Sequence, residues 1–454
     1  MRFTALTCDS PDALTFGHAA HPVRCGFDLH VGAGEVFPEI NFTLPPMKVE
    51  KANLDAIVRQ YEEIIDGVIG RLLELGNNGA MIEFEHAPQM TEELEIGAEI
   101  TAAIKKKLRA AHEEHGLRTA LRVTICDIRE KQRPPRLRSG NAAATVIEAF
   151  RRNAAAGADL LAIESIGGKE VSDAALMEAD VAGLLLALGI LAPRDSRHLW
   201  REIVGIAEEH KIVPSGDTAC AFANTAMVLA DQKYIPNVLA AVVRAMSAVR
   251  TLAAHEVGAI GPTKDCAYEG PVIKAITGFP VSLEGKSAAC AHFSHMGNIA
   301  MAACDLWSNE SVQNVKLLAG FAPEVFTEIL VYDCRLLNQA LTDGSEATLR
   351  RLMIDSDALR SVHALVISPQ ASFEIAKAIV AEPDDFTRTR AAGLTACRLI
   401  RETVESGKMT LPKRERTWLD RIEAELEEYI DEQQVLAETA SSFGDLYLSA
   451  EYGL

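Results

Sequence analysis

The sequence predicts an α/β protein built as a (β/α)8 TIM barrel with additional helical segments toward the C-terminus. Short apolar runs recur along the first part of the chain, and each is followed by a turn and then by a helical pattern. Such alternation is typical of a parallel sheet whose faces are covered by helices. The number of runs fits a closed barrel better than an open sheet.

The predicted strands are short, apolar and bounded mostly by turn residues. They fall at residues 25–31, 80–86, 119–127, 158–165, 211–216, 257–263 and 274–282. No eighth strand stands out from its surroundings.

Between these strands lie segments with apolar residues at intervals of three and four, which is the helical period. Residues 53–75 and 91–116 are the clearest cases. The apolar run at 181–192 is too short to span a bilayer, so we expect a buried helix there. Beyond about residue 296 the pattern is helical. We therefore expect a catalytic barrel over 1–300 and a mainly helical extension over 301–454 that packs on the barrel or on a partner.

Composition excludes several classes of protein. The 454 residues are 48% hydrophobic, which suits a large globular core. A formal net charge of −19 argues against a nucleic-acid partner, because phosphate binding needs clustered Lys and Arg. No signal-peptide pattern begins the chain, and we expect no membrane contact. Nine cysteines without paired spacing indicate reduced thiols and a cytoplasmic location.

Three side chains able to bind a metal follow three successive predicted strands. Glu164 ends one strand, and Cys220 and Cys266 each follow a later one by a short turn. The loops at the carboxyl ends of barrel strands converge, so these residues could meet. Two thiolates and a carboxylate suit Zn²⁺ and leave a fourth position open, as in catalytic zinc sites. Taken on spacing alone, this signal is weak, and buried core cysteines or coincidence explain the pattern better than a metal site does.

Longer segments around these residues resemble a known family. They are "LLAIESIGGKE", "SGDTACAFANTAMVLADQKYIPNV", "AIGPTKDCAYEGPVIKAITGFPVSLEGKSAACAH" and "GNIAMAACDLWSNESVQNVKLL". Together they resemble the catalytic subunit of methanol–corrinoid protein methyltransferases, over nearly the whole chain. The resemblance implies a zinc-containing TIM barrel with the metal held by Glu164, Cys220 and Cys266. It also implies a cytoplasmic enzyme of one-carbon metabolism, in methanogenesis or acetogenesis, that forms an oligomeric complex with a corrinoid protein.

The implied reaction is the transfer of the methyl group of methanol to Co(I) of the partner's corrinoid. Hydroxide is a poor leaving group, and a metal on the alcohol oxygen stabilises its developing charge. One hard carboxylate ligand, Glu164, fits an oxygen substrate better than a third thiolate would. The corrinoid belongs to the partner, so zinc is the only cofactor expected on this chain.

The sequence indicates less clearly which residue exchanges a proton with the substrate. Asp217 is the acid nearest to Cys220 along the chain and is our candidate, although an Asp in "SGDT" equally suits a turn or a helix cap. Lys264 could offset the negative charge of the site. Glu83 and Glu85, with His86 beside them, could contact substrate or partner at a strand end.

Two histidine patterns are weaker candidates for metal binding. Asp28 and His30 partly match a corrinoid-binding pattern, but Ala33 stands where that pattern needs glycine. His292 and His295 have a spacing compatible with a metal but no third ligand beside them.

Two other functions stay open at this point. A zinc barrel could activate another methyl donor, such as a methoxylated compound or a methylamine. The chain could also be a non-catalytic scaffold for a corrinoid protein, and a scaffold would need no zinc.

Overall fold

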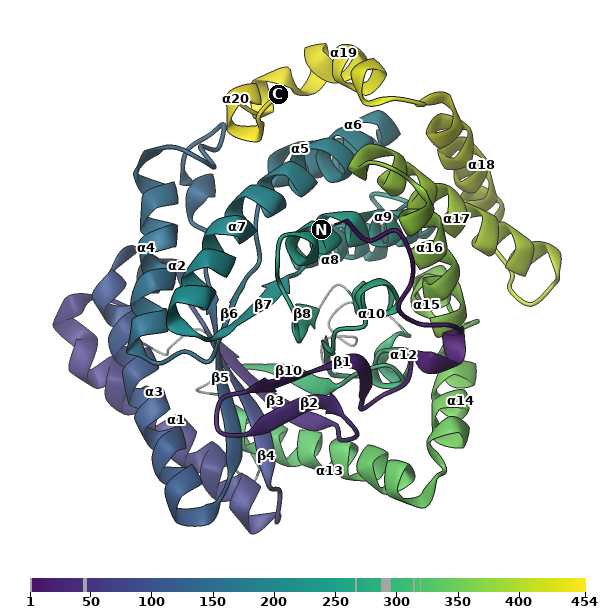
Figure 1. Ribbon diagram of the computed structural model, residues 1–454. Coiled ribbons are helices and arrows are strands. Elements are labelled where there is room, and N and C mark those ends of the chain that lie inside the picture. Colours follow the sequence, from purple (N-terminus) through teal and green to yellow (C-terminus); the bar gives the residue numbers. More distant parts are fainter. Residues whose placement is uncertain (1, 44–46, 266–267, 287–294, 313–314, 319) are drawn as a thin grey trace.

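The computed structural model describes residues 2–43, 47–265, 268–286, 295–312, 315–318 and 320–454. Within them eight parallel strands form one sheet in the order β7-β6-β5-β4-β3-β10-β9-β8. The end strands of that order adjoin, and between them the Ser215 hydroxyl donates to the Pro262 carbonyl at 2.6 Å. The predicted barrel is therefore confirmed as a nearly closed one (Figure 1). Its strands are β3 (Phe37–Thr43), β4 (Gly79–Glu85), β5 (Arg118–Ile125), β6 (Leu160–Ile163), β7 (Val213–Asp217), β8 (Thr263–Asp265), β9 (Val281–Glu284) and β10 (Leu306–Val312).

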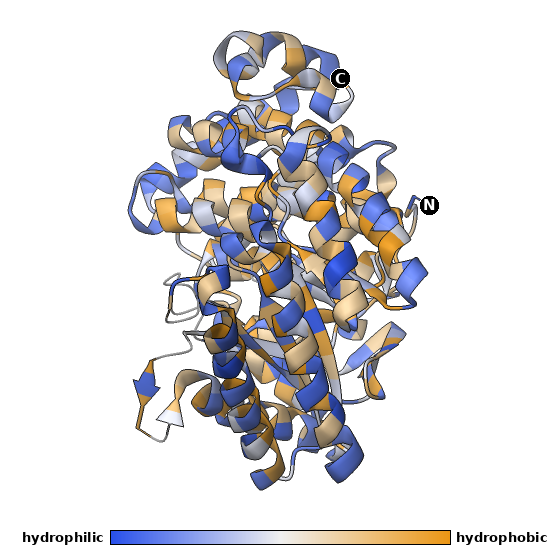
Figure 2. Ribbon diagram, turned by 90° about the vertical axis from the view of Figure 1, so that its left-hand side faces the viewer, coloured by the Kyte–Doolittle hydropathy of each residue, from blue (hydrophilic) through white to orange (hydrophobic). Residues whose placement is uncertain are grey.

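The long outer helices each bury one apolar face. In α1 (Leu54–Glu74), predicted at 53–75, the buried residues recur every three or four positions: Ile57, Tyr61, Ile65, Val68 and Leu72. Figure 2 shows polar and apolar residues alternating along such helices. The others are α3 (Leu94–His115), α4 (Gly140–Ala156), α7 (Ala192–His210) and α13 (Ala322–Asp343), whereas α9 (Asn237–Glu256) is buried on all sides.

The apolar run at 181–192 is helical and buried, as predicted. It comprises α6 (Val181–Leu185), a π-helical turn (Leu186–Leu191) and the start of α7. Among the described residues, α9 alone is long and apolar enough to cross a membrane. Here α9 is a core helix, because it is buried from Val238 to Glu256 between α7, α8 (Cys220–Asp231) and α17 (Asp385–Glu405).

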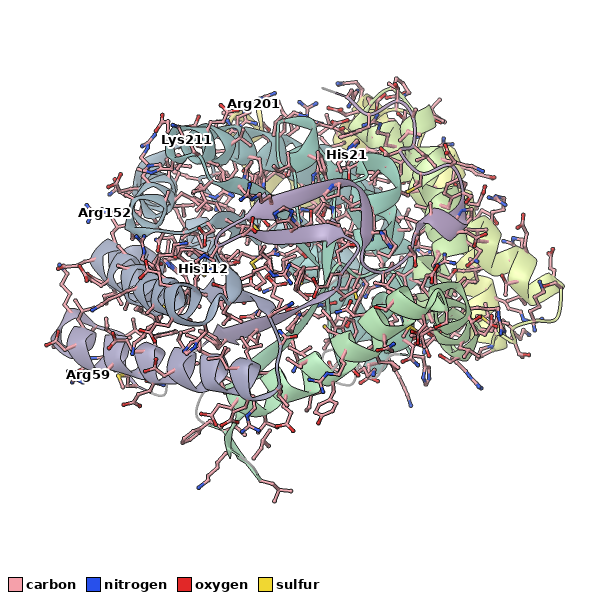
Figure 3. The ribbon with its side chains drawn as sticks, turned by 60° about the horizontal axis from the view of Figure 1, so that its bottom comes forward. His21, Arg59, His112, Arg152, Arg201 and Lys211 are labelled. Carbon is pink, nitrogen blue, oxygen red and sulfur yellow. The ribbon has the colours of Figure 1, made fainter. Side chains whose placement is uncertain are left out.

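The prediction of a first barrel strand at 25–31 is wrong. Those residues form the turn of an antiparallel hairpin, β1 (His18–Cys25) and β2 (Leu29–Ala33). The hairpin buries Leu29 and Val31 against residues near the starts of barrel strands, such as Met81 and Ala120. It therefore covers the amino ends of the strands. Figure 3 shows it crossing in front of the barrel, with His21 on β1.

Two later strands were predicted too early in the chain. β8 begins only at Thr263, and the range 274–282 contains the end of α10 (Gly270–Thr277) before β9 begins. In the first case the apolar residues 257–262 form the loop between α9 and β8. In the second, α10 is buried on all sides, so it lacks the polar face that distinguishes a helix from an apolar strand.

The eighth strand is β10, at Leu306–Val312, after the boundary near residue 300 and within the region expected to be helical. It pairs in parallel with β3 and β9. Its sequence, LWSNESV, has polar Ser308 and Asn309 buried inside the fold, so it lacks the apolar pattern of a strand.

The remaining helices pack on the outside of the barrel helices. α16 lies against α10, α17 against α9, and α19 against α6. In Figure 1 the last helices, in yellow, run along the outer edge of the molecule and end beside α4 and α5 (Lys169–Glu178). These helices are α14 (Glu346–Asp357), α15 (Val362–Ile367), α16 (Pro369–Ala381), α18 (Lys413–Glu428), α19 (Glu432–Phe443) and α20 (Ser449–Tyr452).

Candidate metal centre

Glu164 and Cys220 lie at the carboxyl ends of adjacent strands. Glu164 directly follows β6, and Cys220 begins α8 three residues after Asp217, the last residue of β7. The strands are in register so that Ile163 is opposite Asp217. Cys266 directly follows β8 and lies outside the described residues. Within the part of the chain that the structure describes, no group of three or more His, Cys, Asp or Glu is arranged to hold a metal.

Asp217 links the two loops through its buried carboxylate. Its Oδ1 accepts from the Ser165 and Thr218 amides at 3.0 and 2.9 Å. Its Oδ2 accepts from the Ser165 hydroxyl at 2.6 Å and from Trp200 Nε1 at 2.9 Å. Asp217 therefore fixes the residue after Glu164 relative to the turn before Cys220. Both oxygens already accept hydrogen bonds, and proton handling by Asp217 stays a prediction.

Arg250 completes this arrangement from inside the core. Its guanidinium lies 3.0 Å from Asp217 Oδ1 and donates to the Ser165 hydroxyl at 2.5 Å and to the Thr218 carbonyl. Arg250 and Asp217 are both buried, so each neutralises the other in a low-dielectric region. The sequence reasoning missed Arg250. The signal that could have found it is a pair of arginines, Arg244 and Arg250, within the otherwise apolar helix 237–256.

Cys220 occupies the first position of α8 and is buried. The Thr218 hydroxyl lies 3.5 Å from its sulfur. The preceding amide, that of Ala219, donates to Glu269 Oε1 at 2.7 Å, which also accepts from the Thr251 hydroxyl at 2.8 Å. Cysteine binds metals through its thiolate form.

Glu164 is surrounded by charges of both signs. Burial is the largest cause that raises its pKa, to about 7, and the negative charges of Glu85 and Asp217 act in the same direction. Lys264 and Arg250 oppose that shift. An ionised carboxylate here lacks enough positive charge around it, so a cation bound at Glu164 would be stabilised.

Polar residues also fill the barrel interior beside Glu164. Lys264 Nζ lies 2.9 Å from Glu85 Oε2 and 3.4 Å from Glu83 Oε1. Asn41 Nδ2 donates to the same Glu85 oxygen at 3.2 Å. Lys264 thus offsets negative charge, as the sequence suggested, and Glu83 and Glu85 point into the barrel.

His86 has a different position from its two acidic neighbours. Its ring packs against Phe84 with a centroid distance of 4.9 Å, and its Nδ1 lies 3.3 Å from the Thr91 hydroxyl. It lies so close to Gly97 of α3 that a Cβ there would be 2.4 Å from His86 Cε1. His86 therefore belongs to the packing between β4 and α3 rather than to the barrel interior.

The other histidine candidates lie apart from Glu164 and Cys220 or cannot be assessed. His30 is exposed on β2, at the opposite end of the barrel, where its Nε2 lies 3.0 Å from Asp28 Oδ1. His295 is exposed, and His292 lies outside the described residues.

The chain is similar to known proteins over nearly its whole length. The family described as the methanol-cobalamin methyltransferase B subunit matches residues 1–447. A curated relative from Methanosarcina barkeri (strain Fusaro / DSM 804), named methanol–corrinoid protein co-methyltransferase, is 39% identical over 435 residues, which is 95% of this chain and 94% of the relative. A chain of the crystal structure of the methanol:cobalamin methyltransferase complex MtaBC from Methanosarcina barkeri has a TM-score of 0.96 and 37% identity, with 100% of both chains covered. The chain belongs to the methanol-cobalamin methyltransferase B subunit family.

Proposed function

We propose that this protein is a zinc-dependent methyltransferase that transfers the methyl group of methanol to Co(I) of a partner corrinoid protein. The observation that carries the proposal is the position of Glu164 and Cys220 in a chain of this family. They lie at the carboxyl ends of adjacent strands, and the hydrogen bond from the Ser165 amide to Asp217 joins their loops. A relative's name includes methanol and a corrinoid protein, and the similar solved structure is a complex. We further propose a cytoplasmic complex of this chain with its corrinoid partner.

The donor set fits zinc. Glu164 offers a carboxylate whose pKa is raised to about 7 by burial first and by the nearby charges of Glu85 and Asp217, and Cys220 offers a sulfur at a helix N-terminus. Cys266 would be the third ligand. Two sulfurs and one oxygen suit Zn²⁺ and leave one position for substrate. When bound, zinc would act as a Lewis acid toward the alcohol oxygen.

The reaction sets a clear proton requirement. The carbon–oxygen bond of methanol breaks, Co(I) supplies the electron pair of the new carbon–cobalt bond, and the departing hydroxide takes up one proton to become water. Asp217, our candidate from the sequence, lies next to the site but already accepts hydrogen bonds at both oxygens. Its direct contribution is to hold the loop of Glu164, and Lys264 on β8 contributes positive charge that acts on Glu164.

Methyl transfer can be tested directly by spectroscopy. The protein is mixed with zinc, methanol and a corrinoid protein reduced to Co(I), and we expect the Co(I) absorption to be replaced by that of methyl-Co(III). A reaction without methanol is the control. If methanol is inert but a methylamine or a methoxylated compound reacts, the donor assignment is wrong. If no donor reacts and the purified protein binds no zinc, the scaffold function replaces the enzyme.

The ligands can be tested by single substitutions. Cys220→Ala and Cys266→Ala should each lose most bound zinc and methyl transfer while remaining folded, because Cys220 lies at the very start of α8 and Cys266 comes directly after β8 in the sequence. Cys397→Ala is the matched control, since Cys397 is buried in α17. Full zinc content in either ligand variant would reject that residue.

A further inference from the structure

The loop that follows Glu164 is held at successive residues by different parts of the fold. The Ser165 amide donates to Asp217 on β7. The next amide, that of Ile166, donates to Asp127 Oδ2 at 3.1 Å, in the loop after β5. Asp127 is itself fixed by the buried Arg129, whose Nε and Nη2 donate to it at 2.8 and 2.7 Å. The position of Glu164 therefore depends on contacts from both neighbouring strands.

A further contact with this loop comes from the far end of the chain. The Gly168 amide donates to the hydroxyl of Tyr452 in α20 at 2.9 Å. Tyr452 is buried, although it is two residues from the last residue of the chain. The matched family range ends at residue 447, and the similar solved structure covers this chain to its last residue.

The neighbour of Tyr452 fixes α20 in place. The Glu451 carboxylate accepts from the Arg138 amide at 2.6 Å and from the Ser139 hydroxyl. Both donors lie at the start of α4, which follows β5 in the barrel. Since α20 is bound to the barrel at Glu451, the Tyr452 hydroxyl is presented to Gly168 from a fixed point.

The loop is packed so closely that its backbone has little room to move. A Cβ at Gly167 would lie 2.2 Å from the Cβ of Asp195 in α7, and a Cβ at Gly168 would lie 2.8 Å from the Ala187 carbonyl. Gly168 also has φ of +83°, which favours glycine. The Gly168 amide is buried behind this packing, so the Tyr452 hydroxyl is the partner it needs.

We propose that Tyr452 is a positioning residue for the metal centre, and that α20 keeps the Glu164 loop in the conformation that binds the metal. The inference rests on the proposed zinc function. Tyr452 acts through Gly168 and the four-residue link from there back to Glu164. A loop already ordered before binding loses less conformational freedom when the metal binds, so removal of the contact should weaken metal binding.

The test compares two variants that each lose one phenolic oxygen. Tyr452→Phe removes the acceptor for the Gly168 amide. Tyr447→Phe is the matched control, because Tyr447 is also buried, lies 6.0 Å from Tyr452 between ring centroids, and has no hydroxyl hydrogen bond among the described residues. Zinc affinity is measured by competition with a chelating dye, well below the melting temperature. Hydrogen exchange is measured on the metal-free protein over residues 165–170.

We expect Tyr452→Phe to bind zinc about tenfold more weakly and to exchange about tenfold faster over residues 165–170, while Tyr447→Phe matches wild type in both. Faster exchange with unchanged zinc affinity would overturn the positioning role and leave the zinc function standing. Equal loss of affinity in both variants would also overturn it, because the effect would then be general to this segment. Absence of zinc binding in the wild type would instead refute the proposed function, and the inference with it.

Discussion

The chemistry of the candidate site depends on side chains that do not themselves bind the metal. Asp217, Arg250 and Trp200 are all buried. Asp217 and Arg250 both form hydrogen bonds with Ser165 and Thr218, and Trp200 donates to Asp217. A buried carboxylate is stable only when its lone pairs are satisfied, and Asp217 is satisfied by the loops that carry Glu164 and Cys220. Local stability and ligand position are therefore linked at this residue.

Asp217→Asn tests that link. The amide keeps the shape of the carboxylate but removes its charge beside Arg250, and it turns an NH₂ group toward groups that are themselves donors. We expect unfolding free energy to fall by about 3 kcal/mol and zinc affinity to fall at least about tenfold.

Urea unfolding and chelator competition measure these two effects. Asp173→Asn is the control, because Asp173 pairs with Lys169 on the surface of α5 and should contribute under about 0.5 kcal/mol. A variant as stable as wild type and with full zinc affinity would show that Asp217 does not position the loops that carry Glu164 and Cys220.

Gly167→Ala probes the packing of the same loop. The added Cβ would meet Asp195 at 2.2 Å, so either the loop or the buried Asp195–Arg129 pair must shift. We expect a loss of about 2–3 kcal/mol in unfolding free energy and weaker zinc binding. Gly205→Ala in α7 is the matched control: its Cβ meets nothing within 4 Å, so it should gain about 0.5–1 kcal/mol. Equal effects of the two substitutions would contradict the close packing at Gly167.

The sequence could indicate the ligands but not the residues that position them. Glu164 and Cys220 stand out because they follow recognisable strands, and strand ends converge in a barrel. Arg250 and Tyr452 lie in helices far from those strands in sequence, and only the tertiary fold brings them to Ser165 and Gly168. Nothing local in the sequence marks such a pairing.

At the scale of elements, prediction succeeded where the periodic pattern was clear and failed where it was not. The strands at β4 to β6 and helix α1 have clear apolar patterns. They and β7, whose sequence VPSGD contains a Pro-Ser-Gly turn signal, were predicted within a few residues. The hairpin β1–β2 alternates like a barrel strand, and β10 has buried polar residues, so both were misread. Alternation shows that one face is buried, but it does not show against what.

A substitution in the hairpin tests whether the amino ends of the barrel strands affect zinc binding at their carboxyl ends. Leu29 of β2 is fully buried against the amino ends of the strands, so Leu29→Ala should cost about 3 kcal/mol in unfolding free energy. Zinc content of the folded protein should not change, because the ligands lie at the opposite ends. His30→Ala, on the same strand but exposed, is the control and should change stability by under about 0.5 kcal/mol. Zinc loss in folded Leu29→Ala would show that the two ends are coupled.

Across the whole molecule, buried histidines make stability depend on acidity. Burial is the main cause that lowers the pKa of His86 and His255 to about 4 and of His363 to about 3. Below pH 6.5 the unfolded chain takes up protons at these residues that the folded chain does not. The unfolding free energy contributed by each must therefore fall as pH is lowered from about 6.5 toward the folded pKa. Glu39, whose pKa burial raises to about 7, acts in the opposite direction.

The substitution His363→Gln removes one of these buried histidines and so tests its contribution to the pH dependence of the unfolding free energy. His363 lies in α15, where its Nε2 is 3.2 Å from Asn237 Oδ1, and the positive charge of Arg244 adds to the effect of burial on its pKa. Between pH 6 and pH 5 one such proton is worth about 1.4 kcal/mol per pH unit. The variant should therefore lose less stability over this interval than wild type, by about that amount, in urea titrations at the two pH values. The same substitution at exposed His115 should keep the wild-type slope. Parallel slopes for wild type and His363→Gln would mean that His363 is protonated in the folded protein, because a histidine charged in both states takes up no proton on unfolding.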